Sequence, residues 1–281
     1  MTTLPPSQLS PMNLHRTVSG TGFPMLCLHG HPGAGYCMSV FTSFLSQEFR
    51  TIAPDLRGYG KSRVSQPFGM NQHLMDLDAL LDRFQVSRFV ALGWSLGGIL
   101  ALELALRHPD RVSGLILVAT SARPWSNHPR TGWQDDLLTG MASLVNRISP
   151  GNSVGIELGK RSLFRYLVQQ HTPKTYGFLA REALPAYLQT SSHATNALNQ
   201  ALRSRYNRLP DLKNIQCPSL VLAGEGDRHI TVESSLETAK HLPQAECRVY
   251  SNVAHLFPWE IGDRVQADIQ RWLVAHPEIK T

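Results

Sequence analysis

The 281 residues contain no apolar run long enough to cross a membrane as a helix. Residues 1–20 also lack the apolar stretch that a secretory signal peptide requires. We therefore expect a cytoplasmic protein with no membrane partner. Hydrophobic residues make up 42% of the chain and charged residues 17%, a composition that can fill a substantial globular core.

Cysteine is scarce. The four cysteines (Cys27, Cys37, Cys217 and Cys247) are scattered without C-x-x-C spacing, which favours buried free thiols over disulfides or a zinc site. His29 and His31 form an H-x-H pair, but no further ligand follows at the spacing of a metal site. We expect no metal and no cofactor.

Clustered charge is also missing. The chain has a net charge of +6 without a polybasic run, which argues against a nucleic-acid partner. The excess lies in residues 123–214, which hold twelve Lys and Arg against five Asp and Glu. Two interpretations stay open. Some of these arginines could face a pocket and favour an anionic substrate, or all could form an ordinary solvated surface. The candidates are Arg161, Arg165, Arg203 and Arg205.

The rest of the chain is organised around a G-x-S-x-G turn. An apolar strand pattern begins at Phe89 and runs into the turn that carries Ser95, and the helical stretch Ile99 to His108 follows. The turn is so sharp that side chains at Gly93 and Gly97 would collide with their surroundings. The pattern predicts a nucleophilic serine raised above the carboxyl end of a buried strand.

Buried-strand patterns alternate with helical ones on both sides of this turn. The strands are expected at residues 24–28, 51–54, 89–93, 112–119, 219–223 and 247–250, and a closing helix at 260–274. This rhythm predicts an α/β protein with a mostly parallel, doubly wound sheet flanked by helices.

Residues 123–214 break the rhythm and show only helix-like stretches, such as 154–170 and 196–207. We expect an inserted helical cap there, on a core made of residues 1–122 and 215–281. A helical side layer without contact to the site is the alternative.

A nucleophilic serine needs a base and an orienting carboxylate. Asp227 follows one predicted strand and His255 follows the next, in the chain order Ser, Asp, His. Glu225 is the rival acid, but it lies nearer its strand. The loop after the strand that ends at Ala119 offers no acid.

Two glycine-rich loops follow the first two buried strands. H-G-H-P-G (residues 29–33) lacks the spacing of a phosphate loop and fits an oxyanion loop, in which the main-chain N–H of His31 faces the site. D-L-R-G-Y-G-K-S (residues 55–62) ends like a P-loop, but Asp55 stands where that motif requires glycine. Nucleotide binding is not expected.

Together these motifs resemble the α/β-hydrolase fold superfamily, in the branch of capped serine esterases, lactonases such as 3-oxoadipate enol-lactonase, and cofactor-free haloperoxidases. The resemblance implies that Ser95 is the nucleophile, Asp227 the acid and His255 the base. It further implies that the N–H groups of His31 and Leu96 form the oxyanion hole. Dehalogenases and epoxide hydrolases of this fold carry aspartate at the position of Ser95, and the proline iminopeptidase pattern is not matched at His31 or Leu96.

The resemblance implies a serine hydrolase that cleaves a small carboxylic ester or lactone. Two alternatives stay open: a small-ligand receptor of the same fold with little turnover, and a carbon–carbon bond hydrolase or lyase that uses the same triad. The sequence does not indicate an oligomeric state.

Overall fold

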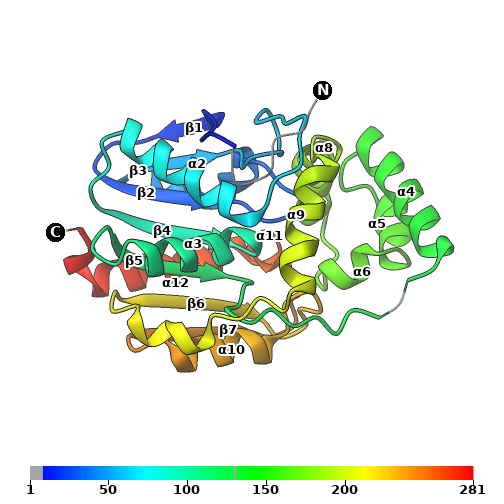
Figure 1. The fold of residues 1–281 in the computed structure, drawn as a ribbon. Coiled ribbons are helices and arrows are strands. Elements are labelled where there is room, and N and C mark those ends of the chain that lie inside the picture. Colours follow the sequence, from blue (N-terminus) through cyan, green and yellow to red (C-terminus); the bar gives the residue numbers. More distant parts are fainter. Residues whose placement is uncertain (1–8, 130, 281) are drawn as a thin grey trace.

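A computed structural model describes residues 9–129 and 131–280 and contains a seven-stranded sheet (Figure 1). The strand order across the sheet is β1-β3-β2-β4-β5-β6-β7. Six strands are parallel, and β1 pairs antiparallel with β3. The predicted mostly parallel, doubly wound sheet is confirmed. The strands are β1 (Arg16–Ser19), β2 (Phe23–Leu28), β3 (Phe49–Pro54), β4 (Phe89–Trp94), β5 (Val112–Val118), β6 (Ser219–Gly224) and β7 (Ala245–Tyr250).

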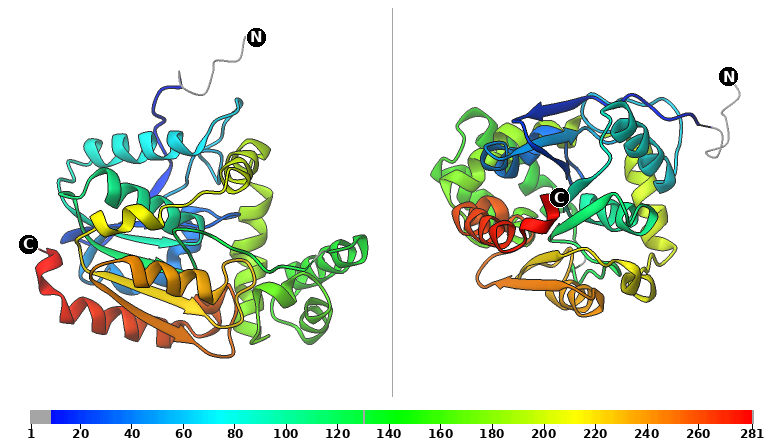
Figure 2. Two further views of the ribbon diagram at one scale, coloured as in Figure 1. Left: turned by 60° about the horizontal axis from the view of Figure 1, so that its bottom comes forward. Right: turned by 90° about the vertical axis from the view of Figure 1, so that its left-hand side faces the viewer.

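Helices cover both faces of the sheet. The 3-10 turn η2 (Gly35–Met38), α1 (Ser39–Leu45) and α12 (Gly262–Ala275) pack on one face, and α2 (Met70–Arg83), α3 (Leu96–Arg107) and α10 (Val232–His241) on the other (Figure 2). Successive residues of β4 serve opposite layers: Val90 and Leu92 join the first layer, and Phe89 and Ala91 the second. This alternation explains why a strand buried on both faces reads as a continuous apolar run.

The described residues between β5 and β6 form helices and loops, with no strand among them. These helices lie at the end of the sheet toward which the parallel strands point (Figure 1). They are α4 (Trp133–Ile148), α5 (Ser153–Lys160), α6 (Phe164–Leu167), α7 (Pro173–Phe178), the π-helical turn η3 (Leu179–Ala183), α8 (Leu184–Leu188), α9 (Ser192–Arg203) and the 3-10 turn η4 (Leu209–Asn214).

The helix-like stretch predicted over residues 154–170 is interrupted in the structure. The structure ends α5 at Lys160 and starts the short α6 at Phe164. Gly159 near the end of α5 gives the reason. A side chain at this position would collide with the hydroxyl of Tyr176 in α7, so the close packing of α7 requires glycine. Because glycine is a poor helix former, it favours the end of the helix here.

The closing helix predicted over residues 260–274 is confirmed as α12, within two residues at each end, and a short helix, α11 (Phe257–Glu260), precedes it. Glu260 turns its carboxylate inward to accept a hydrogen bond from the N–H of Ala254, at 2.9 Å. The periodicity of the apolar residues does not reveal such a polar anchor.

All four cysteines are free, and Cys27 and Cys37 are buried, which confirms the prediction of free thiols. Burial raises the pKa of the Cys27 thiol to about 12, so this sulfur is held protonated. Within residues 9–129 and 131–280, no helix is both long enough and apolar enough to span a membrane.

His73 of α2 is buried between the rings of Tyr59 and Phe68. Burial, followed by the charges of His29 and Arg57, lowers the pKa of His73 to about 3. In the unfolded chain the imidazole of His73 becomes protonated near pH 6.5, whereas in the folded chain it stays neutral down to about pH 3. The contribution of His73 to stability is therefore complete above pH 6.5 and declines as the pH falls through that interval.

We expect His73→Leu to reduce the pH dependence of the free energy of unfolding by about 1.4 kcal/mol per pH unit between pH 6 and 4. Urea unfolding at several pH values measures this slope, whatever the variant does to absolute stability. His241→Gln, at an exposed position, is the control. Parallel slopes for wild type and His73→Leu would show that His73 is protonated in the folded protein.

Candidate active site

Ser95 lies between β4 and α3, at the carboxyl end of the sheet. Its backbone has φ 54° and ψ −117°, a conformation that a residue with a side chain rarely adopts. The strands on either side of β4 in the sheet are β2 and β5. Because the chain order reverses at β2, Ser95 stands at the switch point, where doubly wound sheets place their ligand sites.

Close backbone packing holds this turn in place. A Cβ atom on Gly93 would lie 2.2 Å from the carbonyl oxygen of Gly97, and one on Gly97 would lie 2.0 Å from that of Leu28. Gly30, in the loop after β2, comes so near that an added Cβ would lie 3.0 Å from the Cβ of Ser95. The glycines therefore let the oxyanion-loop candidate and the serine turn approach each other.

Asp227 and His255 meet at the same end of the sheet. Asp227 lies in the loop after β6 and His255 in the loop after β7, and the two residues are only 3% and 4% exposed. The Nδ1 of His255 is 2.7 Å from Oδ2 of Asp227. The other carboxylate oxygen accepts hydrogen bonds from the N–H groups of His229 and Ile230, at 2.8 and 3.0 Å. These two bonds fix the orientation of the carboxylate beside the imidazole of His255.

Glu225, the rival acid, is exposed. Its own N–H bonds the carbonyl of Tyr250 in β7, at 2.9 Å, which aligns the loop that carries Asp227. The structure therefore brings Asp227 and not Glu225 to the imidazole of His255.

The loop over residues 29–33 is anchored by its histidines. His29 is fully buried, and its Nε2 accepts the N–H of Leu56 at 3.0 Å while its Nδ1 lies 2.8 Å from the carbonyl of Gly30. Nδ1 of His31 lies 3.0 Å from the hydroxyl of Tyr59. Burial lowers the pKa of each of these two histidines to about 4, so both rings are neutral near pH 7.

Two backbone N–H groups are available near Ser95. That of Leu96 is at the first position of α3, where no carbonyl of the helix can accept its bond. That of His31 makes no hydrogen bond to any described part of the chain. The amino end of α3 adds a partial positive charge at this point.

The carboxylate of Asp55 holds the shape of the loop over residues 55–62, the loop whose sequence ends like a P-loop. One carboxylate oxygen accepts the N–H of Gly35 at 2.7 Å, and the other accepts the N–H of Lys61 at 2.9 Å. The carboxylate thus occupies the centre of the loop and ties it to the start of η2. No group of three or more potential metal ligands is found in residues 9–129 and 131–280.

Two contributors to the site were missed in the sequence. His229 packs edge-on against His255, with ring centroids 5.2 Å apart, and its other neighbour is the ring of His128, stacked at 4.9 Å. Burial, followed by the charge of His255, lowers the pKa of His229 to about 3, so it stays neutral beside the candidate base. The position of His229 two residues after Asp227 was the one sequence signal that could have indicated its place beside the site.

Glu260 is the second missed residue. Its carboxylate accepts the N–H of Ala254, next to His255, and the N–H groups of Gln169 and Gln170 from the segment after α6. Burial raises the pKa of Glu260, while these three bonds oppose the shift. Glu260 thereby joins the His255 loop to the helical segment between β5 and β6.

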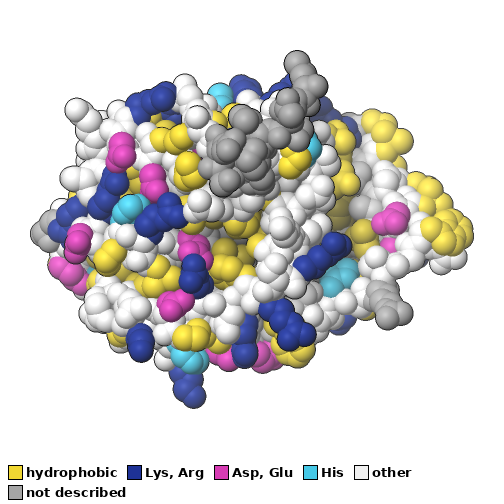
Figure 3. All heavy atoms as spheres, in the orientation of Figure 1, with side chains coloured by type: hydrophobic (Ala, Val, Ile, Leu, Met, Phe, Trp, Pro, Cys, Tyr) yellow, Lys and Arg dark blue, Asp and Glu magenta, His cyan; other side chains and the backbone are white. Residues whose placement is uncertain are grey.

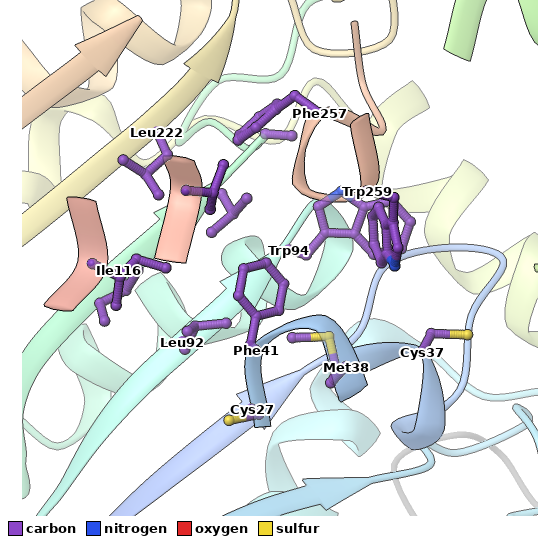
Figure 4. Packing of buried hydrophobic residues seen from close by; sticks show 14 of the residues in the cluster. Cys27, Cys37, Met38, Phe41, Leu92, Trp94, Ile116, Leu222, Phe257 and Trp259 are labelled. Atoms are coloured by element: carbon purple, nitrogen blue, oxygen red, sulfur yellow. The ribbon is translucent and has the colours of Figure 1, made fainter. Parts of the chain in front are cut away.

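Aromatic rings form the wall behind His255. The ring of Trp94, next to Ser95 in the chain, lies 5.6 Å from that of His255. Its other neighbour is the ring of Trp259, at 4.7 Å (Figure 4). Phe178 of α7 stacks on Trp259 at 4.2 Å. The wall is therefore shared by the sheet, the last loop and a helix of the 123–214 segment, and it keeps water from this side of the imidazole.

A pocket of about 800 Å³ opens beside the site without reaching Ser95. His229 lies between the pocket and His255, because it lines the pocket and its ring contacts that of His255. Four apolar residues, Pro124, Trp125, Leu202 and Ile230, line the pocket together with polar and charged ones. The pocket therefore lies next to the candidate base, on the far side of the His229 ring.

Of the four candidate arginines, Arg205 lines this pocket. Arg161 and Arg203 are exposed, and Arg165 is bound to Asp135 at 2.7 Å. Arg123 also lines the pocket, but Glu237 neutralises it at 2.6 Å. With Glu233 on the same wall, the charges in the pocket balance, so any attraction for an anion depends on Arg205.

Comparison with known proteins gives a family-model match to the alpha/beta hydrolase fold over residues 24–150. These residues include the serine turn and both glycine-rich loops.

Three similar proteins cover nearly the whole chain. A proline iminopeptidase, PfmaB, of Pestalotiopsis fici is 28% identical, over 89% of this chain and 91% of its own. A 2-hydroxymuconate semialdehyde hydrolase of Pseudomonas putida is 27% identical, over 93% and 90%. The solved structure of a thermophilic esterase from Thermogutta terrifontis, with malate bound, superposes with a TM-score of 0.70 and 27% identity, over 95% and 94%.

Proposed function

Because the chain belongs to the α/β-hydrolase fold superfamily and is a hydrolase of that fold, we propose that it cleaves a carboxylic ester or lactone of a small molecule through an acyl-Ser95 intermediate. The observation that carries the proposal is the buried contact of 2.7 Å between His255 and Asp227, at the end of the sheet where Ser95 stands in its strained turn. A serine hydroxyl becomes an effective nucleophile only beside such a base.

In the proposed reaction, Oγ of Ser95 attacks the carbonyl carbon and its proton passes to Nε2 of His255. The negative oxygen that forms is stabilised by the N–H groups of His31 and Leu96 and by the amino end of α3. When the ester bond breaks, His255 returns the proton to the departing alcohol. Water then releases the acid from Ser95 by the same steps, while Asp227 holds the tautomer of His255 and stabilises its cation.

The proposal includes a core of residues 1–122 and 215–281 and a cap of residues 123–214. The contacts of the cap with the site support it. The N–H of Leu256 bonds the carbonyl of Leu167 at 3.0 Å, and that of Ser191 bonds the carbonyl of Gly58 at 2.8 Å. Such a cap would exclude water from the reacting groups.

The pocket beside His229 fits the alcohol part of the substrate. His255 must give its proton to the departing oxygen, so that oxygen lies on the side of His255, and the group attached to it can extend past His229. The apolar wall favours an aryl or alkyl group, and Arg205 could add an attraction for a carboxylate on that group.

This attraction should be small. An exposed charge pair is worth about 0.2–1 kcal/mol, or up to about fivefold in rate. We expect esters with a carboxylate on the alcohol part to gain this factor over matched neutral esters in kcat/KM at low salt. The gain should fade as the ionic strength passes about 0.1 M, where the Debye length is about 10 Å.

A matched panel of neutral and acidic esters and lactones, at low and high salt, measures the effect. Arg205→Gln should abolish the preference, and Arg203→Gln, at an exposed position outside the pocket lining, should preserve it. If acidic and neutral esters react equally at every salt concentration, the substrate is not selected by charge.

The overall proposal is tested by turnover of short-chain aryl esters. The similarity to the Pseudomonas putida semialdehyde hydrolase favours a second candidate, hydrolysis of a carbon–carbon bond by the same triad. Activity on a vinylogous diketone with none on esters would select that candidate. Tight binding of esters or lactones with a kcat orders of magnitude below about 10 s⁻¹ would instead identify a small-ligand receptor.

A further inference from the structure

Helix α4 exposes an apolar stripe along its outer face. The stripe consists of Trp133, Leu137, Met141, Leu144 and Ile148, whose exposed fractions are 73%, 53%, 47%, 63% and 78%. Their spacing of four, four, three and four residues places them on one face of the helix. Ala142 and Asn146, on the opposite face, are buried. In Figure 3, hydrophobic side chains gather at the end of the molecule where Figure 1 draws α4.

Single exposed apolar residues are normal, but a continuous stripe is not. The five side chains are about half to three-quarters exposed, and a contiguous exposed apolar patch of more than a few hundred Å² on a soluble protein marks an interaction site. A standard protein interface buries about 800 Å² on each partner. The stripe is large enough to be the apolar centre of such an interface.

The stripe is symmetric about Met141. If a second α4 packs antiparallel on the first, Trp133 faces Ile148 of the partner, Leu137 faces its Leu144, and Met141 faces its own copy. Gly140 lies beside this centre with no atom within 4 Å of an added Cβ, so it leaves room for the two helices to approach. An interface in which one surface meets its own copy is what a two-fold axis requires.

The charges beside the stripe obey the same symmetry. Asp136 and Arg147 are exposed, lie three helical turns apart, and so share one flank of the stripe. Neither side chain pairs with any described residue. Antiparallel packing brings Asp136 of each copy toward Arg147 of the other, whereas two-fold parallel packing would leave the charged flanks of the two copies on opposite sides of the interface.

We propose that the protein forms a two-fold symmetric homodimer through antiparallel packing of α4 against α4. A membrane surface is the weaker partner for this face. Helices that lie on membranes carry Lys and Arg on their polar side, whereas α4 carries Asp135, Asp136 and a single arginine. The interface lies on the cap and does not involve the triad, so the dimer does not depend on the proposed reaction.

The position of the axis is tested by cysteine cross-linking in the full-length chain. Met141→Cys places the two new thiols across the axis, where mild oxidation should join them into a covalent dimer. Trp133→Cys is the matched control on the same stripe. Its two copies would lie about 20 Å apart in the antiparallel pair, too far for a disulfide. Efficient cross-linking of Trp133→Cys with none of Met141→Cys would overturn the antiparallel arrangement.

Sedimentation equilibrium of the unmodified chain should give the mass of a dimer at micromolar concentrations. Met141→Asp and the single charge reversals Asp136→Arg and Arg147→Asp should each raise the dissociation constant at least tenfold. The double reversal should restore wild-type association, and Val274→Asp, at a still more exposed apolar position on α12, should change nothing. A monomer at 100 μM, a dimer indifferent to Met141→Asp, or binding of the monomer to anionic lipid vesicles through Met141 would overturn the proposal.

Discussion

Replacing Ser95 by alanine should lower kcat on a short-chain aryl ester by about 10⁴ or more. The variant loses the oxygen that attacks the carbonyl, while the N–H groups of His31 and Leu96 remain and leave a small residual rate. Steady-state kinetics of the purified variant, with circular dichroism to compare its fold, measures the loss. Ser46→Ala, at the half-buried residue that follows α1, is the control for a lost hydroxyl elsewhere.

The backbone at Ser95 allows a second variant that separates chemistry from folding. At φ 54° an alanine keeps the strain of the turn, whereas a glycine relieves it. Ser95→Gly should therefore be as inactive as Ser95→Ala but at least as stable as the wild type. Retention of a tenth of the activity by either variant would rule out Ser95 as the nucleophile.

Replacing Asp227 by asparagine should lower kcat by a factor on the order of 10⁴ with the fold intact. The amide can no longer stabilise the imidazolium of His255, and its NH₂ group can force the wrong tautomer on the ring. The substitution nearly preserves the volume of a side chain that is 1% exposed, so packing should change little.

Glu225→Gln is the matched comparison, since it makes the same chemical change two residues away on an exposed side chain. It should alter kcat less than threefold. The two variants are compared on one substrate at one pH where wild-type activity is maximal. The opposite ranking would move the role of the acid from Asp227 to Glu225.

The sheet and the ends of its strands could be predicted because buried parallel strands leave strong local signals. The apolar runs that end before His29, Asp55, Ser95, Asp227 and His255 each become a strand, and the polar residue follows at the carboxyl edge. Parallel topology alone then brings these residues to one end of the sheet. The glycines of the serine turn were equally readable, since the 2.0 Å clash that a side chain at Gly97 would create permits no other residue.

What could not be predicted depends on contacts between distant segments. Glu260 binds the N–H groups of Ala254 and Gln169 because the last loop meets the segment after α6, a contact with no local pattern. His229 becomes a neighbour of His255 only when two loops meet. The broken helix at Gly159 follows from the packing of Tyr176, which the helical periodicity of residues 154–170 does not contain.

The charge of the cap illustrates the same limit. The count of charged residues over residues 123–214 predicts an excess of positive charge, but not whether the basic side chains face a pocket or the solvent. In the structure, Arg165 and Arg208 are paired with Asp135 and Glu103, and Arg205 alone of the four candidate arginines lines the pocket. Side-chain pairing, rather than composition, decides what a substrate would meet.

The most direct test of the central claim is the chemical identity of the intermediate. The Asp227→Asn variant, in which release of the acid should be slow, is mixed with a short-chain p-nitrophenyl ester and quenched in acid, and its peptides are analysed by mass spectrometry. We predict one added acyl group per chain, located on Ser95 and absent from the double variant with Ser95→Ala. An acyl group on another residue, or ester turnover without any covalent adduct under these conditions, would contradict the proposed mechanism.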